Sequence, residues 1–516
     1  MKATIDKVDG GIIPDQPDYA LPDGLWTDAR NMRFRDGGAE RIGGNLPVLG
    51  SLSTTAVWAQ SLRDVSANVD YWVYGSLTTL YGTDGTSHAN VSSVTYSASA
   101  DLGWTGGAFH GYIIANEGTV EPQTWQPGLT NKFQPLANWP ASTLCKVLRP
   151  YGDFLMALRV TESGVYNPRL IRWSDAAAVG ALPGSWDYTD PTNQSGRAEL
   201  GQTDDELIDC LPMREVNVVY KKNSTWLMQY IGLPDVFQFR QAFSQSGMLT
   251  ENCAGAFESN HFVVTDSDII VHNGAEITPI ADKRTRKWLF STINADYYRR
   301  SFVVVDQKNR EIWFCFPESG HDYPNLALCW NWPHNTFYPR ELGTDVAFGA
   351  TGPIPVATDS PLWDAATGTW DTTTLGLWGP AQAAPWSGRI LTVDSMRQLA
   401  YQADTGLTFN GAAIQSYLMR SNMGLTRDVG SMKRIRRILP KVFGTAGDVL
   451  QIRVGARPTI DGPLSLQGPF EFTIGTDYKL DVRLSGRFIF LWIQHSTANW
   501  WQIIGYDIEF DGDGLR

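Results

Sequence analysis

The sequence predicts an all-β protein: a β-propeller of about six blades with an extended N-terminal arm and additional C-terminal β-structure. Frequent glycine (49), proline (28) and tryptophan (20) are typical of short strands joined by tight turns. Between residues 51 and 345 strand hairpins recur about every 40–60 residues, the interval of one four-stranded blade. Closing such blades into a wheel also covers strand edges that separate hairpins would expose.

At 516 residues the chain is too long for one typical core, so we expect several units. For the body, a pair of stacked β-sandwiches is the alternative to a propeller, because its strands would recur similarly. The expected units are an N-terminal arm (1–50), a propeller body (51–345), a Gly/Pro/Trp-rich insertion or tip loop (346–390), and a C-terminal β domain or closing blades (391–516).

The arm holds a motif rich in arginine and glycine. Met32–Arg35 is predicted as a short strand, Asp36-Gly37 as a hairpin turn and Ala39–Ile42 as the returning strand. Such a pair cannot bury its apolar side alone, so it must dock on a larger body of its own chain or of another. We expect its two apolar side chains to be buried and its three arginines to find carboxylates. The predicted docking residues are Arg33, Phe34, Arg35, Arg41 and Ile42.

The body contains one predicted helix, Asp282–Tyr297, on which Trp288, Leu289 and Ile293 share a face. The insertion that follows the body is rich in proline and small residues. Its four tryptophans indicate docking onto a partner or onto the body rather than disorder. They are Trp363, Trp370, Trp378 and Trp386.

Catalytic signatures are absent from the sequence. It contains no Gly-x-Ser-x-Gly turn, no Gly-Lys phosphate loop, no Gly-x-Gly-x-x-Gly and no His-Glu-x-x-His. The five cysteines have neither metal-ligand nor redox spacing. His261 and His272 flank one hairpin, and we interpret them as strand histidines satisfied by hydrogen-bonding partners. We therefore predict no enzymatic activity, no catalytic residue, no cofactor and no metal site.

The net charge of −12 argues against a protein that grips nucleic acid over its general surface. Two basic clusters, 283–287 and 433–437, stand out against it. Each could contact DNA phosphates or an acidic patch of a neighbouring subunit, or could be only a solvated face. The second alternates isoleucine with charge, as an edge strand protected against aggregation does. The candidate contact residues are Arg284, Arg286, Lys287, Arg434, Arg436 and Arg437.

The first seven residues lack the apolar core of a signal peptide, and no apolar run approaches the length of a membrane-spanning helix. We therefore expect synthesis in the cytoplasm and no membrane-spanning segment.

Taken in order along the chain, several short motifs resemble the tail hub or nozzle proteins of short-tailed bacteriophages, also called tail tubular or packaged-DNA stabilisation proteins. The residues that carry the resemblance are Asn31-Met32-Arg33-Phe34-Arg35-Asp36-Gly37, Arg41-Ile42-Gly43-Gly44, Ile171-Arg172-Trp173-Ser174-Asp175 with Trp186-Asp187, the His261–Gly274 hairpin with Pro279-Ile280, Glu311-Ile312-Trp313-Phe314, Ser485-Gly486-Arg487-Phe488 and Trp501-Gln502-Ile503-Ile504-Gly505-Tyr506. The resemblance spans most of the chain but not residues 346–390.

The resemblance implies a structural subunit of the virion tail, made in the host cytoplasm, that forms a homohexameric ring. Such a ring extends the DNA channel below the portal and adaptor rings and carries tail fibres or a plug. It retains packaged DNA and conducts the double strand without sequence specificity during ejection. Six chains at −12 each, −72 in total, could line a channel that repels DNA, whose charges are spaced about 1.7 Å apart along the axis.

Two other functions remain open for a propeller of this kind. One is a glycan hydrolase, which would need a pocket in which carboxylates and arginines converge. The other is a carbohydrate-binding tail module, for which the tryptophans would supply stacking platforms.

Overall fold

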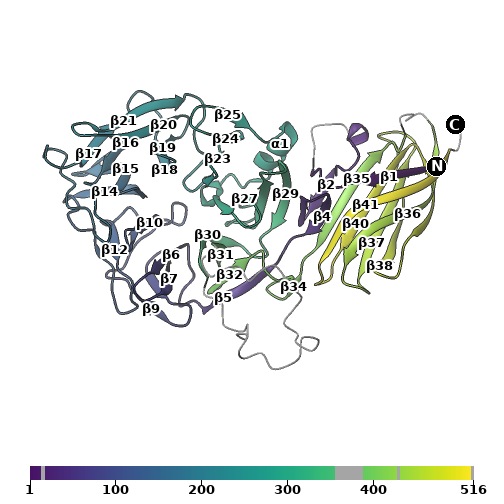
Figure 1. Cartoon of the computed structure of the whole chain (residues 1–516), viewed down its shortest axis with the longest axis horizontal. Coiled ribbons are helices and arrows are strands. Elements are labelled where there is room, and N and C mark those ends of the chain that lie inside the picture. Colours follow the sequence, from purple (N-terminus) through teal and green to yellow (C-terminus); the bar gives the residue numbers. More distant parts are fainter. Residues whose placement is uncertain (13–17, 355–387, 427–430, 513–516) are drawn as a thin grey trace.

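The computed structural model describes residues 1–12, 18–354, 388–426 and 431–512. The described chain is almost entirely antiparallel β-structure, with one α-helix and two short 3-10 turns. Figure 1 shows two bodies side by side, a ring of small sheets and a β-sandwich. The prediction of an all-β protein with a β-propeller is confirmed.

Six consecutive four-stranded sheets form blades 1 to 6 of the propeller, each in chain order from the inner strand outward. Their strands are β6 (Trp58–Asp64), β7 (Val69–Gly75), β8 (Leu80–Thr83) and β9 (His88–Asn90); β10 (Thr105–Phe109), β11 (Tyr112–Asn116), β12 (Gln123–Trp125) and β13 (Gln134–Pro135); β14 (Thr143–Tyr151), β15 (Phe154–Glu162), β16 (Val165–Trp173) and β17 (Gly196–Glu199); β18 (Leu207–Met213), β19 (Val216–Lys221), β20 (Thr225–Gly232) and β21 (Val236–Phe243); β22 (Ala254–Phe257), β23 (Asn260–Val264), β24 (Ile269–His272) and β25 (Ile277–Pro279); and β26 (Phe302–Asp306), β27 (Glu311–Phe316), β28 (Leu326–Asn331) and β29 (Thr336–Glu341).

A seventh blade closes the wheel and joins strands from distant parts of the sequence. It consists of β30 (Val346–Gly352), β31 (Arg389–Asp394), β32 (Leu399–Ala403) and β5 (Asn45–Ser51), extended by β33 (Thr408–Phe409) and β34 (Ala412–Ala413). Each inner strand contacts the next around the axis, and β30 contacts β6. The six blades expected within 51–345 are present. The seventh is not visible in the hairpin pattern because its outer strand precedes all the other blades.

Tryptophans pack the blades against one another. The Trp104 ring, at the entry to blade 2, stacks on Trp58 of blade 1 with ring centroids 6.3 Å apart. Its indole Nε1 donates to the Ser76 carbonyl at 2.7 Å. A side chain at Gly75 would crowd this ring, because a Cβ there would lie 2.9 Å from Nε1. The packing of large aromatic side chains against glycines thus accounts for part of the high tryptophan and glycine content.

The second body is a sandwich of two sheets, built from both ends of the described chain. One sheet has the order β3-β4-β41-β36-β39, with β1 also paired to β41, and the other has the order β2-β35-β40-β37-β38. The strands are β1 (Lys2–Asp6), β2 (Asp28–Arg30), β3 (Met32–Arg35), β4 (Gly38–Arg41), β35 (Ser416–Met423), β36 (Lys433–Gly444), β37 (Val449–Arg457), β38 (Ser465–Thr473), β39 (Leu480–Gly486), β40 (Phe488–His495) and β41 (Trp501–Gly512).

These boundaries differ from the expected ones at residues 50, 345 and 390. Residues 1–41 supply four sandwich strands rather than a separate arm, because β1 and β4 pair along β41 and β2 pairs with β35. Residues 346–352 and 389–403 belong to the last blade. The four tryptophans of the expected insertion lie outside the described residues.

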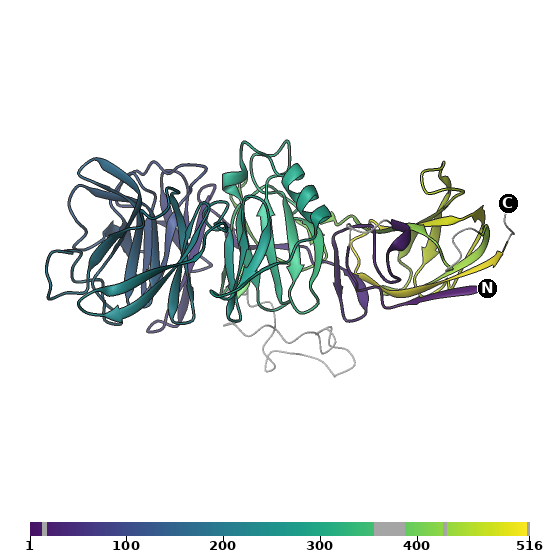
Figure 2. The ribbon, with the colours of Figure 1, turned by 90° about the horizontal axis from the view of Figure 1, so that it is seen from above.

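Helix α1 (Lys283–Thr292) begins at Asp282, whose carboxylate accepts the backbone N–H groups of Arg284 and Thr285. The helix is shorter than predicted because Ile293 is already extended and bridges to Glu318. The 3-10 turns are η1 (Asp18–Ala20) and η2 (Tyr298–Arg300). Figure 2, turned by 90°, shows α1 at one face of the propeller. No helix among the described residues is long and apolar enough to cross a membrane.

Candidate functional site

The Arg/Gly motif lies where the propeller meets the sandwich. Strands β3 and β4 pair as predicted, with Met32 opposite Arg41, and both residues of the Asp36-Gly37 turn have positive φ, as a two-residue hairpin turn of this type requires. The hairpin also contacts blade 6, where Thr336 Oγ1 donates to the Phe34 carbonyl at 3.4 Å. The motif therefore docks on its own chain.

Arg33 is the centre of a buried ionic network that joins three parts of the chain. Its Nε and Nη2 donate to the two carboxylate oxygens of Glu311 at 2.7 and 3.0 Å. Nη2 also donates to Asp404 at 2.9 Å, and the other oxygen of Asp404 accepts from Arg340 Nη1 at 2.8 Å. The Tyr338 hydroxyl donates to Glu311 at 2.7 Å. We call these five residues the Arg33 cluster; they come from β3, from blade 6 and from the loop after β32.

Charge is balanced within the Arg33 cluster, with two guanidinium groups facing two carboxylates. Burial opposes ionisation of Asp404, but Arg33 and Arg340 outweigh it and hold the pKa of this carboxyl far below its ordinary value. Arg340 also lies over the Trp313 ring, 4.1 Å from its centroid. Glu311 is fully buried, so its carboxylate oxygens are satisfied by Arg33 and Tyr338 and not by solvent. The cluster thus connects the propeller and the sandwich, and removal of one of its charged groups would leave another buried charge without its partner.

The other predicted docking residues also lie at this joint. Phe34 and Ile42 are fully buried in the core that includes the sandwich and blade 6. Arg35, about one-third exposed, pairs with Glu40 at 2.6 Å. These placements agree with the expectation from the sequence.

Arg41 is the exception, because it finds no carboxylate within ion-pair distance among the described residues. Its Nη1 donates to the Asn499 carbonyl at 2.5 Å, and its Nη2 donates to the Leu407 carbonyl. Burial lowers the pKa of Arg41 to about 10, partly offset by the charge of Asp448. The expectation of a carboxylate partner is wrong here because the loops that face Arg41 present backbone oxygens instead.

Two glycines of the motif are required by close approach to other backbone. A Cβ at Gly44 would lie 2.0 Å from the Thr408 carbonyl oxygen, and one at Gly43 would lie 2.7 Å from the Asp404 carbonyl carbon. The Gly43 N–H donates to the Asp404 carboxylate at 3.0 Å. Gly43-Gly44 therefore brings the chain against the loop that carries Asp404.

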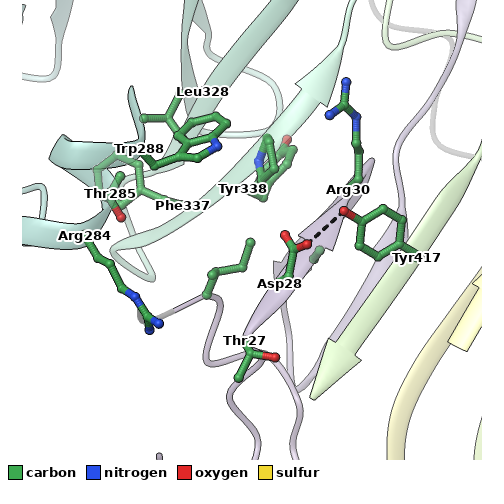
Figure 3. Close-up of a pocket in the computed structure, with 13 residues that line it drawn as sticks. Thr27, Asp28, Arg30, Arg284, Thr285, Trp288, Leu328, Phe337, Tyr338 and Tyr417 are labelled. Atoms are coloured by element: carbon green, nitrogen blue, oxygen red, sulfur yellow. Dashed lines mark hydrogen bonds between the residues drawn. The ribbon is translucent and has the colours of Figure 1, made fainter. Parts of the chain in front are cut away.

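A pocket of about 420 Å³ opens at the same joint, between α1 and β29 on the propeller side and β2 and β35 on the sandwich side. Trp288 and Phe337 line its propeller wall (Figure 3). On the opposite wall the Tyr417 hydroxyl donates to the Asp28 carboxylate at 2.9 Å. Burial raises the pKa of Asp28, and the Tyr417 bond partly opposes this. The pocket thus has aromatic side chains on one wall and holds one carboxylate, Asp28, together with two arginines, Arg30 and Arg284.

The two basic clusters lie on different bodies, one on α1 and the other on β36 (Figure 1). In the first, Arg286 pairs with Asp268 at 2.7 Å, Arg284 lies 3.6 Å from Asp18, and Lys287 is exposed.

In the second cluster, Arg436 pairs with Asp511, Arg437 lies 3.4 Å from Glu509, and Arg434 is exposed. The interpretation of this segment as an edge strand is wrong, because β36 lies between β41 and β39. Its alternation arises from one face packing into the sandwich core, where Ile435 is buried.

His261 and His272 do meet, around the buried hydroxyl of Tyr220. The Tyr220 oxygen lies 2.7 Å from His261 Nδ1 and 2.8 Å from His272 Nε2. The Gly274 N–H faces His272 Nδ1 at 3.3 Å, and His261 Nε2 faces the Pro212 carbonyl at 2.9 Å. These partners require His272 Nε2–H to donate to Tyr220, Tyr220 to donate to His261 Nδ1, and His261 Nε2–H to donate to Pro212. Both rings are therefore satisfied in the neutral form.

This pair predicts a loss of stability in mild acid. Burial lowers the pKa of His261 to about 4 and that of His272 to about 3. Each histidine has a pKa of about 6.5 in the unfolded chain, so below this pH the unfolded chain binds more protons than the folded chain. The contribution of the neutral histidines to the free energy of unfolding is therefore complete above this pH and falls as the pH decreases. At pH 5 the loss is about 2 kcal/mol for each histidine. Thermal unfolding from pH 7 to pH 5 measures it.

The matched variants are the double change His261→Gln, His272→Gln and the change of exposed His334 to Gln. The double variant should be less stable at pH 7 and show a shallower decline toward pH 5, whereas His334→Gln should keep the slope of the unaltered chain. Equal slopes in all three proteins would contradict the assignment.

Sequence reasoning identified the arginines of the opening motif but did not assign the other members of the Arg33 cluster to the site, namely Glu311, Tyr338, Arg340 and Asp404. The available signal was weak: Arg340 is a charged residue in a mostly apolar strand, and Asp404 stands in what looks like an ordinary Asp-Thr-Gly turn. In the described part of the chain, no three His, Cys, Asp or Glu side chains are grouped to hold a metal ion.

No protein-family model matches the sequence, and no curated protein matches it. Among solved structures, the WD40 β-propeller domain of Doa1 is 9% identical, over 70% of this chain and 96% of that chain, with a TM-score of 0.38. The N-terminal domain of Nup159 is 10% identical, over 61% and 93%, with a TM-score of 0.31. A glycoside hydrolase is 10% identical, over 90% and 100%, with a TM-score of 0.24. Scores this low carry no argument about function, and the strand pairing described above defines the propeller.

Proposed function

We propose that this chain is a structural virion protein, a tail hub or nozzle subunit of a short-tailed bacteriophage. In this role it forms a ring below the portal and adaptor rings, extends the DNA channel, retains packaged DNA and conducts it during ejection. The observation that carries the proposal is the meeting of two motifs on which the resemblance rests. Arg33 of the opening motif binds Glu311 of Glu311-Ile312-Trp313-Phe314 with both carboxylate oxygens.

A subunit of a pressurised conduit needs its parts held at a fixed angle. The Arg33 cluster supports that requirement, because a bidentate arginine–carboxylate pair fixes direction as well as distance. The core at the joint is also continuous: buried side chains of the sandwich and of blade 6 belong to one apolar cluster. Load applied to one body would therefore pass to the other without a flexible linker.

Side chains of three neighbouring blades meet at the inner strands of the propeller. Arg149 of blade 3 donates to both oxygens of Asp209 in blade 4 at 2.7 Å and to Asn252 at 2.7 Å. The Arg149 side chain is 17% exposed and lines a pocket together with residues of neighbouring blades. In the proposed ring, the DNA channel would accordingly run between subunits and not through the propeller of each subunit.

Electron microscopy tests this proposal. The purified chain is mixed with the portal–adaptor complex of the same virus and imaged alone and in the mixture. The expected result is a closed ring with an axial hole, carried on the adaptor, with six-fold symmetry. Failure to form a ring both alone and on the portal–adaptor complex would overturn the proposal.

A glycan hydrolase remains the alternative, because one observation favours it. Such an enzyme needs carboxylates and arginines that converge, and Glu206, Glu251, Arg159 and Arg299 line one pocket of the propeller. Release of sugars from host surface glycans by the purified chain, abolished by Glu206→Gln, would favour the enzyme. Absence of release would leave the structural role as the function.

A further inference from the structure

A pocket of about 300 Å³ lies where loops of several blades enter the inner strands of the propeller, and it shares no lining residue with the pocket at the joint. We call it the axial pocket. Its lining comes from strands of blade 3 and from the loops that lead into the inner strands of blades 2, 4, 5 and 6. Convergence of side chains from five blades on one concave site is the usual setting of a ligand site in a rigid scaffold. The residues that the argument uses are Lys146, Arg159, Tyr166, Glu206, Glu251 and Arg299.

Arg159 is directed into this pocket by an irregularity of the backbone. The pairing register of β15 shifts between Leu158 and Val160, and Arg159 at the shift has a φ of +54°. Bulges of this kind redirect a side chain, and a left-handed conformation is unfavourable for arginine. Arg159 Nη2 binds Glu251, while the buried Nε has no hydrogen-bond partner among the described residues. Arg159 is only 6% exposed and lines the pocket.

The pocket lining holds three cations, Lys146, Arg159 and Arg299, and three carboxylates, Asp101, Glu206 and Glu251. Asp101 is paired at 2.9 Å with Arg300, which lies outside the lining. Arg159 is neutralised by Glu251, whose other oxygen accepts from Thr250 at 2.7 Å. Lys146 Nζ donates to the Gly118 carbonyl at 3.4 Å. Neither Lys146 nor Arg299 forms an ion pair with a carboxylate of the described residues.

Glu206 is the one lining carboxylate without an ion-pair partner in the described part of the chain. Lys146 and Arg299 together carry one positive charge more than Glu206 neutralises, so a ligand with a single negative charge would balance the pocket.

The rim of the pocket supplies an aromatic surface. The Tyr166 side chain lines the pocket although the residue is 46% exposed. A phenol ring in this position can stack on the apolar face of a sugar ring while its hydroxyl group stays in contact with solvent. Glu206 can accept hydrogen bonds from hydroxyl groups of the same ring.

We propose that the axial pocket binds a saccharide that carries a carboxylate, such as a uronic acid residue of a glycan. Arg159, Arg299 and Lys146 receive the carboxylate, Tyr166 stacks on the ring, and Glu206 accepts from its hydroxyls. A phosphorylated ligand fits less well, because its second negative charge would face Glu206 and Glu251. This site does not depend on whether the chain assembles into a ring.

The test is calorimetric titration of the full chain with a glucuronate oligosaccharide, its uncharged glucose counterpart, and inorganic phosphate. Glucuronate is expected to bind at roughly millimolar concentration or better and more weakly as salt increases, and glucose to bind at least tenfold more weakly. Phosphate binding stronger than that of glucuronate, or equal binding of glucose, would overturn the proposal.

Variants keep the test specific. Arg299→Ala and Tyr166→Ala alter exposed side chains, and each is expected to weaken glucuronate binding by about tenfold. The matched controls are Arg63→Ala and Tyr478→Ala, which alter exposed side chains elsewhere and should bind as the unaltered chain does. Unchanged affinity in both pocket variants, or no glucuronate binding at all, would refute the site.

Discussion

Replacing Arg33 with alanine is expected to lower the free energy of unfolding by about 3–5 kcal/mol, because it leaves buried carboxylates without their cation. Glu311 is fully buried and would lose both of its guanidinium contacts, and Asp404 would lose one of the two arginines that pair with it and keep Arg340. Calorimetric unfolding of the full chain measures the change. The transition that includes the sandwich and blade 6 should move most, since the cluster lies between them.

Two controls separate this effect from simple loss of an arginine. Arg63→Ala removes an exposed pair with Asp70 and should cost less than about 1 kcal/mol. Adding Glu311→Gln to Arg33→Met should restore part of the stability lost in Arg33→Met alone, because the Arg340–Asp404 pair then remains balanced. In the double variant Arg33→Ala, Arg35→Ala most of the loss should come from Arg33. Unchanged unfolding of that double variant would refute the structural role of the motif.

Phe34→Ala is expected to destabilise the protein by about 3–5 kcal/mol, because a large ring is removed from a fully packed site. The ring lies among side chains of both sandwich and blade 6, so the cavity would open at the joint. The matched control is Phe443→Ala, whose residue is 56% exposed on β36 and should cost little. Urea unfolding followed by tryptophan fluorescence compares the two. Similar losses for both variants would show that Phe34 does not seal the joint.

Local patterns in the sequence predict the elements of this fold well, because turn chemistry and alternation act over a few residues. The Asp36-Gly37 turn, the β3–β4 hairpin and the Asp282 helix cap all follow from residues near them. The end of α1 was missed because Ile293 becomes extended to meet Glu318, a contact between separate segments. Pairing of that kind leaves no local signal.

The contrast between local patterns and long-range contacts also explains which features of the joint the sequence predicts. The burial of Phe34 and the need of Arg33 for a carboxylate follow from chemistry alone, since an amphipathic hairpin must dock and a buried guanidinium must be paired. Which carboxylates it meets does not follow, because Glu311 and Asp404 are 278 and 371 residues away along the chain. The seventh blade was hidden for the same reason, as β5 pairs with β32 across most of the sequence.

The mixing of early and late strands in the sandwich has a consequence for how the protein is made. Lys2 pairs with Glu509, so β1 has no partner until β41 has been translated. At ribosomal speeds the nascent N-terminal strands wait for a time on the order of tens of seconds, with Trp26 and Phe34 unprotected. Blades 1 to 6 need only residues 58–341 and can form during that wait. A chain whose synthesis stopped before residue 404 would lack Asp404 and most strands of the sandwich. Only chains that extend through β41 can form every contact of the joint and the sandwich, so assembly would exclude copies that end earlier.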